Sequence, residues 1–321
     1  MNQFRAVLTI SLFMALNADP GAASEGKISG YMFGDYYRVL SSDDGAGTKN
    51  RNAFEFRRIY FTYNSKIDDE FSIRFRLEAK GNKFGAGGSM VPFVKHAYLK
   101  WKEGVGSADF YFGLSGTPTF AAAEKAWKYR AIEKTMLDLN KIGSSADLGV
   151  ALKGKSGKLG YHVMLGNGKG KAPESDNGKK IYAAGSVQLS DGLQVELYGD
   201  FNMKPGGQDE ITLKGVAGFI NEGFHGGLEV FSRSNKKGAD DGGDETITGL
   251  SAFGALRLGE SLKGFGRVDA VSKEENTDLL VIAGLDHQLA KNVHLMPNFY
   301  IELPDGPDPS IQARLTFFYK F

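Results

Sequence analysis

The chain ends in the stretch SIQARLTFFYKF, residues 310–321, whose side chains divide between the two faces of a strand. Successive side chains of a strand point to opposite faces. One face is entirely apolar or aromatic and consists of Ile311, Ala313, Leu315, Phe317, Tyr319 and Phe321. The other face is polar except for Phe318. A soluble edge strand of this kind would invite aggregation, whereas a strand between lipid and water requires this division. The stretch therefore predicts the closing strand of a transmembrane β-barrel.

The same alternation recurs upstream and predicts the fold class. Phe71–Lys80 alternates apolar and polar side chains at every position, which indicates water on one face. The phase changes at Arg57–Arg58, as a β-bulge that turns both arginines to one side would produce. Short and longer connections take turns along the chain, which a β-sandwich does not require, and no propeller repeat is visible. We predict an all-β fold, a transmembrane antiparallel β-barrel of about 16 strands.

The N-terminus and the composition define the compartment and exclude several functions. A basic start at Arg5, the apolar run Ala6–Leu16 and the small residues 21–24 predict a secretory signal peptide over 1–24, followed by the barrel over 25–321. A net charge of +1 argues against a nucleic-acid partner, and the 43 glycines, 23 phenylalanines and 13 tyrosines suit turns and interfacial belts.

The sequence predicts neither a metal site nor a cofactor. Cysteine is absent, so no thiolate can bind a metal. The five histidines are scattered without paired spacing: His96, His162, His225, His287 and His294. The acidic loops Ser41–Gly47 and Gly238–Asp244 lack the ligand spacing of a calcium loop, and we expect solvated charge there or divalent bridges to lipopolysaccharide.

Residues 117–142 interrupt the strand rhythm. They contain Pro118 and the helix-forming run AAAEKAWKYRAIEKTMLDLN, and they form the third and longest of the longer connections. In position and length this segment resembles the third loop of the general porins, which folds into the barrel. The resemblance implies that residues 117–142 are an inward-folded constriction loop.

Two further resemblances extend this expectation. The residues Leu315, Phe317, Tyr319 and Phe321 resemble the C-terminal signature of bacterial outer-membrane barrels. This implies an outer-membrane location, with Phe321 and Tyr319 as the signal for the barrel assembly machinery. FEFRRIYFTYNSKIDDEFSIRFRLEA and VKHAYLKWK are similar to the phosphate-selective porin O and P family, and FGLSGTPTFAAAEKAWKYR resembles its constriction-loop segment more loosely. The porin resemblance also implies a homotrimer.

The candidate functional site consists of charged residues in the constriction loop and on the polar faces of the strands. In the constriction loop we single out the cations Lys125, Lys128, Arg130 and Lys134. On the strands the candidate lumen-lining residues are Arg57, Arg58, Arg74, Arg76, Lys100, Asp147, Glu196, Asp200 and Arg314, with Glu229 and Asp269 as further acids on later strands. Rings of Arg and Lys favour anions, and opposed charges across a pore create a transverse field.

These features predict a non-enzymatic, passive diffusion porin for small hydrophilic solutes, with a preference for anions. The alternatives are a phosphate- or polyphosphate-selective porin and a non-conducting structural or adhesive barrel. An outer-membrane enzyme such as a barrel phospholipase would need a nucleophile and a base; His162 has Ser145 and Ser186 on nearby strands, but no orienting acid is evident. The expected partners are outer-membrane lipid and lipopolysaccharide.

Overall fold

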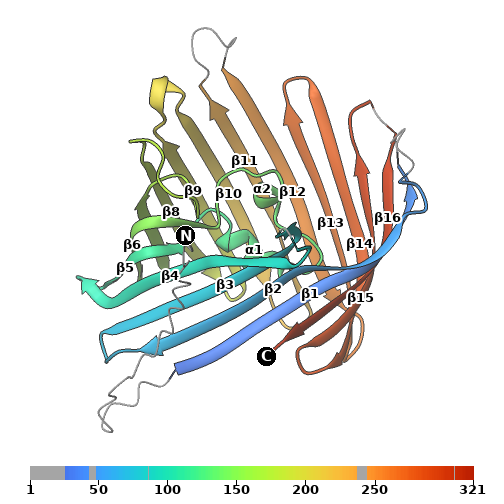
Figure 1. Ribbon diagram of the computed structural model, residues 1–321, viewed down its shortest axis with the longest axis horizontal. Coiled ribbons are helices and arrows are strands. Elements are labelled where there is room, and N and C mark those ends of the chain that lie inside the picture. The colour runs from blue at the N-terminus through green and yellow to red at the C-terminus, as the bar shows by residue number, and fades with distance from the viewer. Residues whose placement is uncertain (1–25, 43–47, 86, 237–243, 307) are drawn as a thin grey trace, which may run out of the picture.

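The computed structural model describes residues 26–42, 48–85, 87–236, 244–306 and 308–321. The predicted signal peptide and most of the two acidic loops, 43–47 and 237–243, lie outside these residues. Within the described residues sixteen antiparallel strands form one closed barrel, in which β1 pairs with both β2 and β16 (Figure 1). The predicted fold class and the number of strands are confirmed.

The strand bounds agree closely with the alternating segments of the sequence. The strands are β1 (Gly26–Ser41), β2 (Asn52–Lys66), β3 (Phe71–Phe84), β4 (Met90–Val105), β5 (Ala108–Gly116), β6 (Ala146–Ser156), β7 (Leu159–Gly166), β8 (Lys180–Ser190), β9 (Leu193–Asn202), β10 (Glu210–Ile220), β11 (Phe224–Asn235), β12 (Glu245–Arg257), β13 (Leu262–Lys273), β14 (Asn276–Ala290), β15 (Val293–Leu303) and β16 (Ser310–Lys320). A short 3-10 turn, η1 (Pro205–Gly207), lies between β9 and β10. The alternation of connection lengths fails at one place: only Glu274 and Glu275 separate β13 from β14, where a longer loop was expected.

The closing strand divides its side chains as its sequence predicts. Leu315, Tyr319 and Phe321 are exposed on the outside, whereas Thr316 is fully buried inside. Backbone hydrogen bonds join Phe321 to Gly30 of β1 in both directions, at 3.1 and 3.0 Å. Because both edges are paired, the barrel leaves no free strand edge at its seam.

β-Bulges place two pairs of consecutive residues on the inner face. The register between β1 and β2 shifts at Arg57, so Arg57 and Arg58 both face inward, as the sequence predicts. A second shift between β3 and β4 falls at Lys95, and Lys95 and His96 are both buried. The second bulge was not predicted, although Lys95 and His96 are consecutive polar residues between Val94 and Ala97, the same signal as at Arg57–Arg58.

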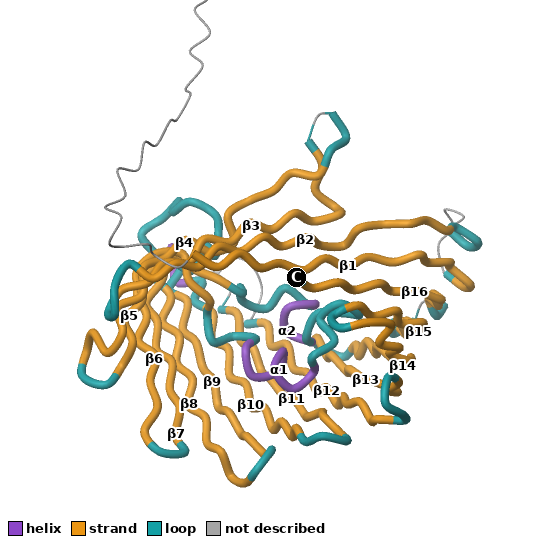
Figure 2. Tube along the Cα trace, turned by 90° about the horizontal axis from the view of Figure 1, so that it is seen from below, coloured by secondary structure: helices purple, strands orange, loops and turns teal. Residues whose placement is uncertain are grey.

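The segment between β5 and β6 folds inside the barrel. It contains α1 (Ala121–Trp127) and α2 (Met136–Leu139), which Figure 2 shows within the ring of strands. Trp127 is 1% exposed and packs edge-on against Phe253 and Phe265, at ring distances of 5.7 and 6.3 Å. An apolar cluster therefore holds this segment to the inner wall at β12 and β13. No helix among the described residues is long and apolar enough to cross a membrane.

Candidate functional site

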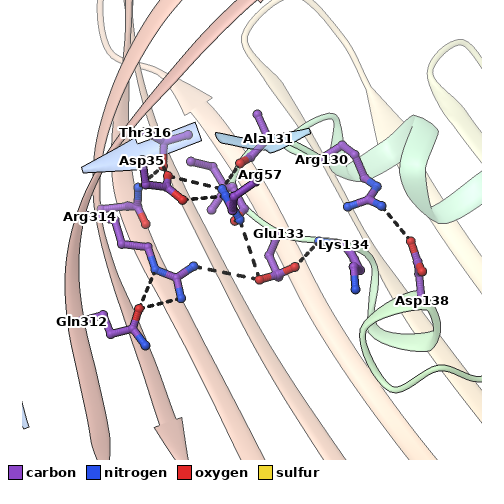
Figure 3. A network of polar contacts seen from close by, with 12 residues as sticks. Asp35, Arg57, Arg130, Ala131, Glu133, Lys134, Asp138, Gln312, Arg314 and Thr316 are labelled. Carbon is purple, nitrogen blue, oxygen red and sulfur yellow. Dashed lines mark hydrogen bonds and ion pairs between the residues drawn. The ribbon is translucent and has the colours of Figure 1, made fainter. Parts of the chain in front are cut away.

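The loop of residues 117–142 is held in place by wall cations that bind its backbone carbonyls. Arg57 donates to the carbonyl of Ile132 at 2.7 Å and also to that of Ala131 (Figure 3). Lys214 donates to the carbonyl of Thr119 at 2.8 Å, and Arg267 donates to that of Lys134. In these contacts the loop contributes only backbone oxygen atoms, so the specificity of the hydrogen bonds comes from the wall side chains.

Arg57 is itself fixed by a buried carboxylate. Its Nε lies 2.5 Å from Oδ2 of Asp35, whose side chain is 1% exposed, and Thr316 also donates to Asp35. Glu133 on the loop lies 3.9 Å from Arg57 and 4.0 Å from Arg314 (Figure 3). The Arg314 guanidinium lies over the Tyr300 ring at 3.7 Å. Both predicted arginines thus face the lumen, but Arg57 acts mainly as an anchor for the loop.

The four cations singled out in the loop lie in different places. Arg130 pairs with Asp138 at 2.9 Å and with Glu124 at 3.3 Å, so its charge is balanced within the loop. Lys125 donates to Gln194 of β9 at 2.8 Å. Lys128 lines a cavity on the side of the short turns, with Lys263 of β13.

Lys134 lines the same cavity as several cations of the barrel wall. A cavity of about 310 Å³ beside the loop is lined by five basic and two acidic side chains. These side chains are Arg57, Arg58, Lys80, Arg130, Lys134, Glu55 and Glu133. Burial lowers the pKa of the Lys134 amine, while Asp138 and Glu133 oppose this shift. The cavity therefore has an excess of positive charge beside the loop.

The same inner wall remains basic toward the short-turn end. On β3, Arg76 and Arg74 donate to Thr62 and Asn64, both at 2.7 Å, and their guanidinium groups lie over tyrosine rings. Nearer the short turns, a larger cavity of about 600 Å³ is lined by Lys100 and other lysines, which outnumber the carboxylates of its lining. Lys100 pairs with Asp109 at 2.6 Å. The predicted residues Arg74, Arg76 and Lys100 thus lie along one basic wall from β3 to β6.

The acids predicted on later strands face inward, but most of them are buried. Asp147 accepts hydrogen bonds from Gly168, Gly170 and Tyr182, and thereby fixes the loop after β7. The other acids are bound by side chains of the wall, through the pairs Asp200–Lys180 at 3.0 Å, Glu196–Lys214 at 3.1 Å and Asp269–Arg267. Glu229 is fully buried, and neither carboxylate oxygen has a hydrogen-bond partner among the described residues. Most of these acids are bound by groups of the wall and the loop, whereas Glu196 also lines two cavities of the lumen.

Several charged residues of the site were not singled out from the sequence. Lys80 continues the polar face of Phe71–Lys80, so the alternation could have identified it. Lys95 pairs with the buried Glu78 at 3.1 Å and was hidden by its bulge. Lys171, in the loop after β7, has no sequence pattern around it. Three further acids, Asp278, Glu302 and Asp308, line another cavity of about 570 Å³ between β13 and β16, beside the buried Asp269.

The described residues contain no group of three or more His, Cys, Asp or Glu side chains placed to hold a metal. His162 and Ser186 line the same cavity at the short-turn end, whereas the hydroxyl of Ser145 accepts a hydrogen bond from Lys95 at 2.6 Å. The three residues considered for hydrolysis therefore do not form one group.

Comparison with known proteins identifies the fold. No model of a protein family matches the chain, and no curated protein matches it in sequence. The anion-selective porin from Comamonas acidovorans is 13% identical over 93% of this chain and 100% of its own, with a TM-score of 0.72. OmpT, an outer membrane protein of Vibrio cholerae in its trimer form, is 12% identical over 94% and 100%, with a TM-score of 0.69. Salmonella typhi OmpF, solved with daunomycin, is 11% identical over 92% and 97%, with a TM-score of 0.61.

The fold is that of the sixteen-stranded outer-membrane porins, in agreement with the predicted location in the bacterial outer membrane. A likeness at 11 to 13% identity shows the fold alone. The solute must therefore be inferred from the lumen of this chain.

Proposed function

We propose that the chain is a passive diffusion porin of the bacterial outer membrane that prefers small anions. The observation that carries the proposal is the cavity beside the constriction loop, in which five cations face two carboxylates. The lumen is narrowed by an inward loop and lined by charge, and it performs no covalent chemistry. We also propose assembly as a homotrimer among lipopolysaccharide, with Phe321 and Tyr319 as the signal for the assembly machinery.

The expected selectivity follows from elementary electrostatics. One charge acting on an ion roughly 8 Å away in water contributes about 0.5 kcal/mol, and salt at about 0.1 M weakens this further. Each exposed lysine of the site should therefore change the anion-to-cation ratio by about twofold. Lys80 and Lys134 are the best candidates, because Arg57 and Arg130 are paired closely with acids of the barrel and loop. Lys80 lies 3.9 Å from Glu78, whose carboxylate is shared with Arg58 and Lys95 at shorter distances.

The test is the reversal potential of the reconstituted protein under a potassium chloride gradient. Wild type should favour chloride, and Lys80→Gln combined with Lys134→Gln should lower the chloride preference by about fourfold. Lys291→Gln, on the exposed turn between β14 and β15, removes the same charge at a position that does not line this cavity and should leave the preference unchanged. Stable insertion without conductance would refute the proposal and favour a structural barrel.

A phosphate-selective porin is the second candidate. It is favoured by the line of cations on the inner face of β3, where Lys80, Arg76 and Arg74 follow one another on alternate residues with Glu78 between them. Replacing chloride by phosphate in the same recording distinguishes the two. A phosphate porin should show saturable block of chloride current by phosphate, and a general porin should not.

A further inference from the structure

Phe318 is the one aromatic side chain on the polar face of the closing strand, and the structure gives it a specific environment. It faces the lumen and lies 6.0 Å from the ring of Tyr31 and 5.8 Å, edge-on, from that of His294. Tyr31 in turn lies 4.4 Å from Tyr60. Aromatic side chains therefore form one wall of this part of the lumen.

This wall lines a cavity of about 350 Å³ at the short-turn end of the barrel, which shares Phe33 and Arg130 with the cavity that Lys134 lines. We call it the aromatic cavity. Its apolar lining consists of Tyr31, Phe33, Tyr129, Ala131, Met296 and Phe318. A concave site of this size, with mainly apolar walls and a few polar groups, is typical of small-molecule binding.

The charges around the aromatic cavity favour an anion. Lys128, Lys263 and Lys320 line it, and none of the three takes part in an ion pair among the described residues. Its one carboxylate, Asp286, is already engaged. Asp286 accepts from the Tyr129 hydroxyl at 3.0 Å and lies 2.7 Å from Nδ1 of His294.

We infer that the aromatic cavity binds organic anions in which a carboxylate is attached to an aromatic ring. The ring would lie against Phe318 and Tyr31, while the carboxylate meets Lys263 and Lys128. This inference rests on the proposed anion porin, because the ligand would reach the cavity through the same lumen. It adds a subsite that distinguishes aromatic from aliphatic carboxylates of equal charge.

An apolar cluster that only supports the loop would not be arranged in this way. The supporting contacts are made by Trp127 and Ile132, which are 1% and 0% exposed. Phe318 and Tyr31 are only partly buried, and they lie at the margin of that cluster. The partly buried rings can contact the apolar part of an amphipathic anion, and the lysines at their edge can bind its charged part.

Equilibrium dialysis of the full-length protein in detergent, with labelled benzoate or acetate and a micelle blank, tests the inference without requiring conduction. Benzoate should bind about tenfold more tightly than acetate, because acetate lacks the ring that the cavity would bury. Lys263→Gln should weaken benzoate binding by about three- to fivefold, and Phe318→Leu, which keeps an apolar side chain for folding, should reduce the preference over acetate. Lys155→Gln, at the rim of a different cavity, is the matched control.

The outcomes separate this inference from the proposed function. Equal binding of benzoate and acetate, or equal behaviour of Lys263→Gln and Lys155→Gln, would overturn the aromatic cavity as a binding site. A chloride-selective channel that fails this dialysis test would leave the porin proposal standing. A barrel that never conducts but binds benzoate as expected would refute the porin proposal alone.

Discussion

Replacing Arg57 by glutamine should release the constriction loop and destabilise the barrel together. The substitution removes hydrogen bonds to the carbonyls of Ala131 and Ile132 and leaves Asp35, which is 1% exposed, without its ion-pair partner. Removing one partner of a buried ion pair costs about 3–5 kcal/mol, within the range expected for two hydrogen bonds from a charged donor. We therefore expect the free energy of unfolding to fall by about 3–5 kcal/mol.

The matched control is Arg74→Gln, because Arg74 faces the same lumen but donates to Asn64 and not to the loop. Urea titration in lipid vesicles and single-channel recording would be carried out on both variants. Arg57→Gln should give larger and noisier current steps, since the loop loses an anchor, while Arg74→Gln should keep the stability and lose part of the anion preference. Adding Asp35→Asn to Arg57→Gln should recover part of the stability, because the buried charge is removed. Equal losses of stability in the two single variants would refute the anchoring role of Arg57.

Three further predictions test the loop and the charge of the lumen. Burial and the nearby Lys95 lower the pKa of the Lys171 amine to about 8, so this charge is lost as the pH rises from 7 to 9. The anion preference, measured as a reversal potential, should therefore fall over this pH range. It should fall less in the Lys171→Arg variant, because arginine keeps its charge. A Cβ at Gly249 would lie 2.3 Å from the Phe231 ring and 3.0 Å from the Met136 sulfur. Gly249→Ala should therefore lower the free energy of unfolding by about 1–3 kcal/mol, as measured by urea titration. Gly185 has open space around it, so Gly185→Ala should change this free energy little. Trp127→Ala should lose about 3–5 kcal/mol of unfolding free energy, and unchanged stability would contradict the apolar attachment of the loop.

The barrel could be predicted from the sequence because the side chains of a membrane strand alternate between apolar residues that face lipid and polar residues that face water. The closing strand and Phe71–Lys80 show the full alternation, and the change of phase at Arg57–Arg58 marked a bulge that the structure contains. The second bulge, at Lys95, was not predicted, although the polar pair Lys95–His96 between Val94 and Ala97 gives the same signal. Alternation predicts which face a residue occupies only between bulges.

The candidate site was harder to predict, because alternation gives the direction of a side chain and not its partners. Arg57 and Arg76 both lie on the inner face, yet Arg57 binds loop carbonyls and Arg76 a wall hydroxyl and a tyrosine ring. The acids Asp147 and Asp269 point inward as expected, but loop amides and Arg267 cover them. These differences depend on where the loop crosses the lumen, and residues 117–142 carry no periodic pattern that fixes its path.

The same residue types, arginine and lysine, therefore anchor the loop to the wall and give the lumen its proposed selectivity for anions. Arg57, Lys214 and Arg267 hold the loop through its backbone oxygens, so these three contacts do not depend on the loop side chains. Lys80 and Lys134 lie next to these anchors and face the cavity. A count of lumen cations from the sequence overestimates the charge that a solute meets, since each anchoring cation is paired with a carboxylate, in the pairs Arg57–Asp35, Lys214–Glu196 and Arg267–Asp269. Selectivity should consequently respond to Lys80 and Lys134, and pore size to Arg57, although all of them belong to one basic surface.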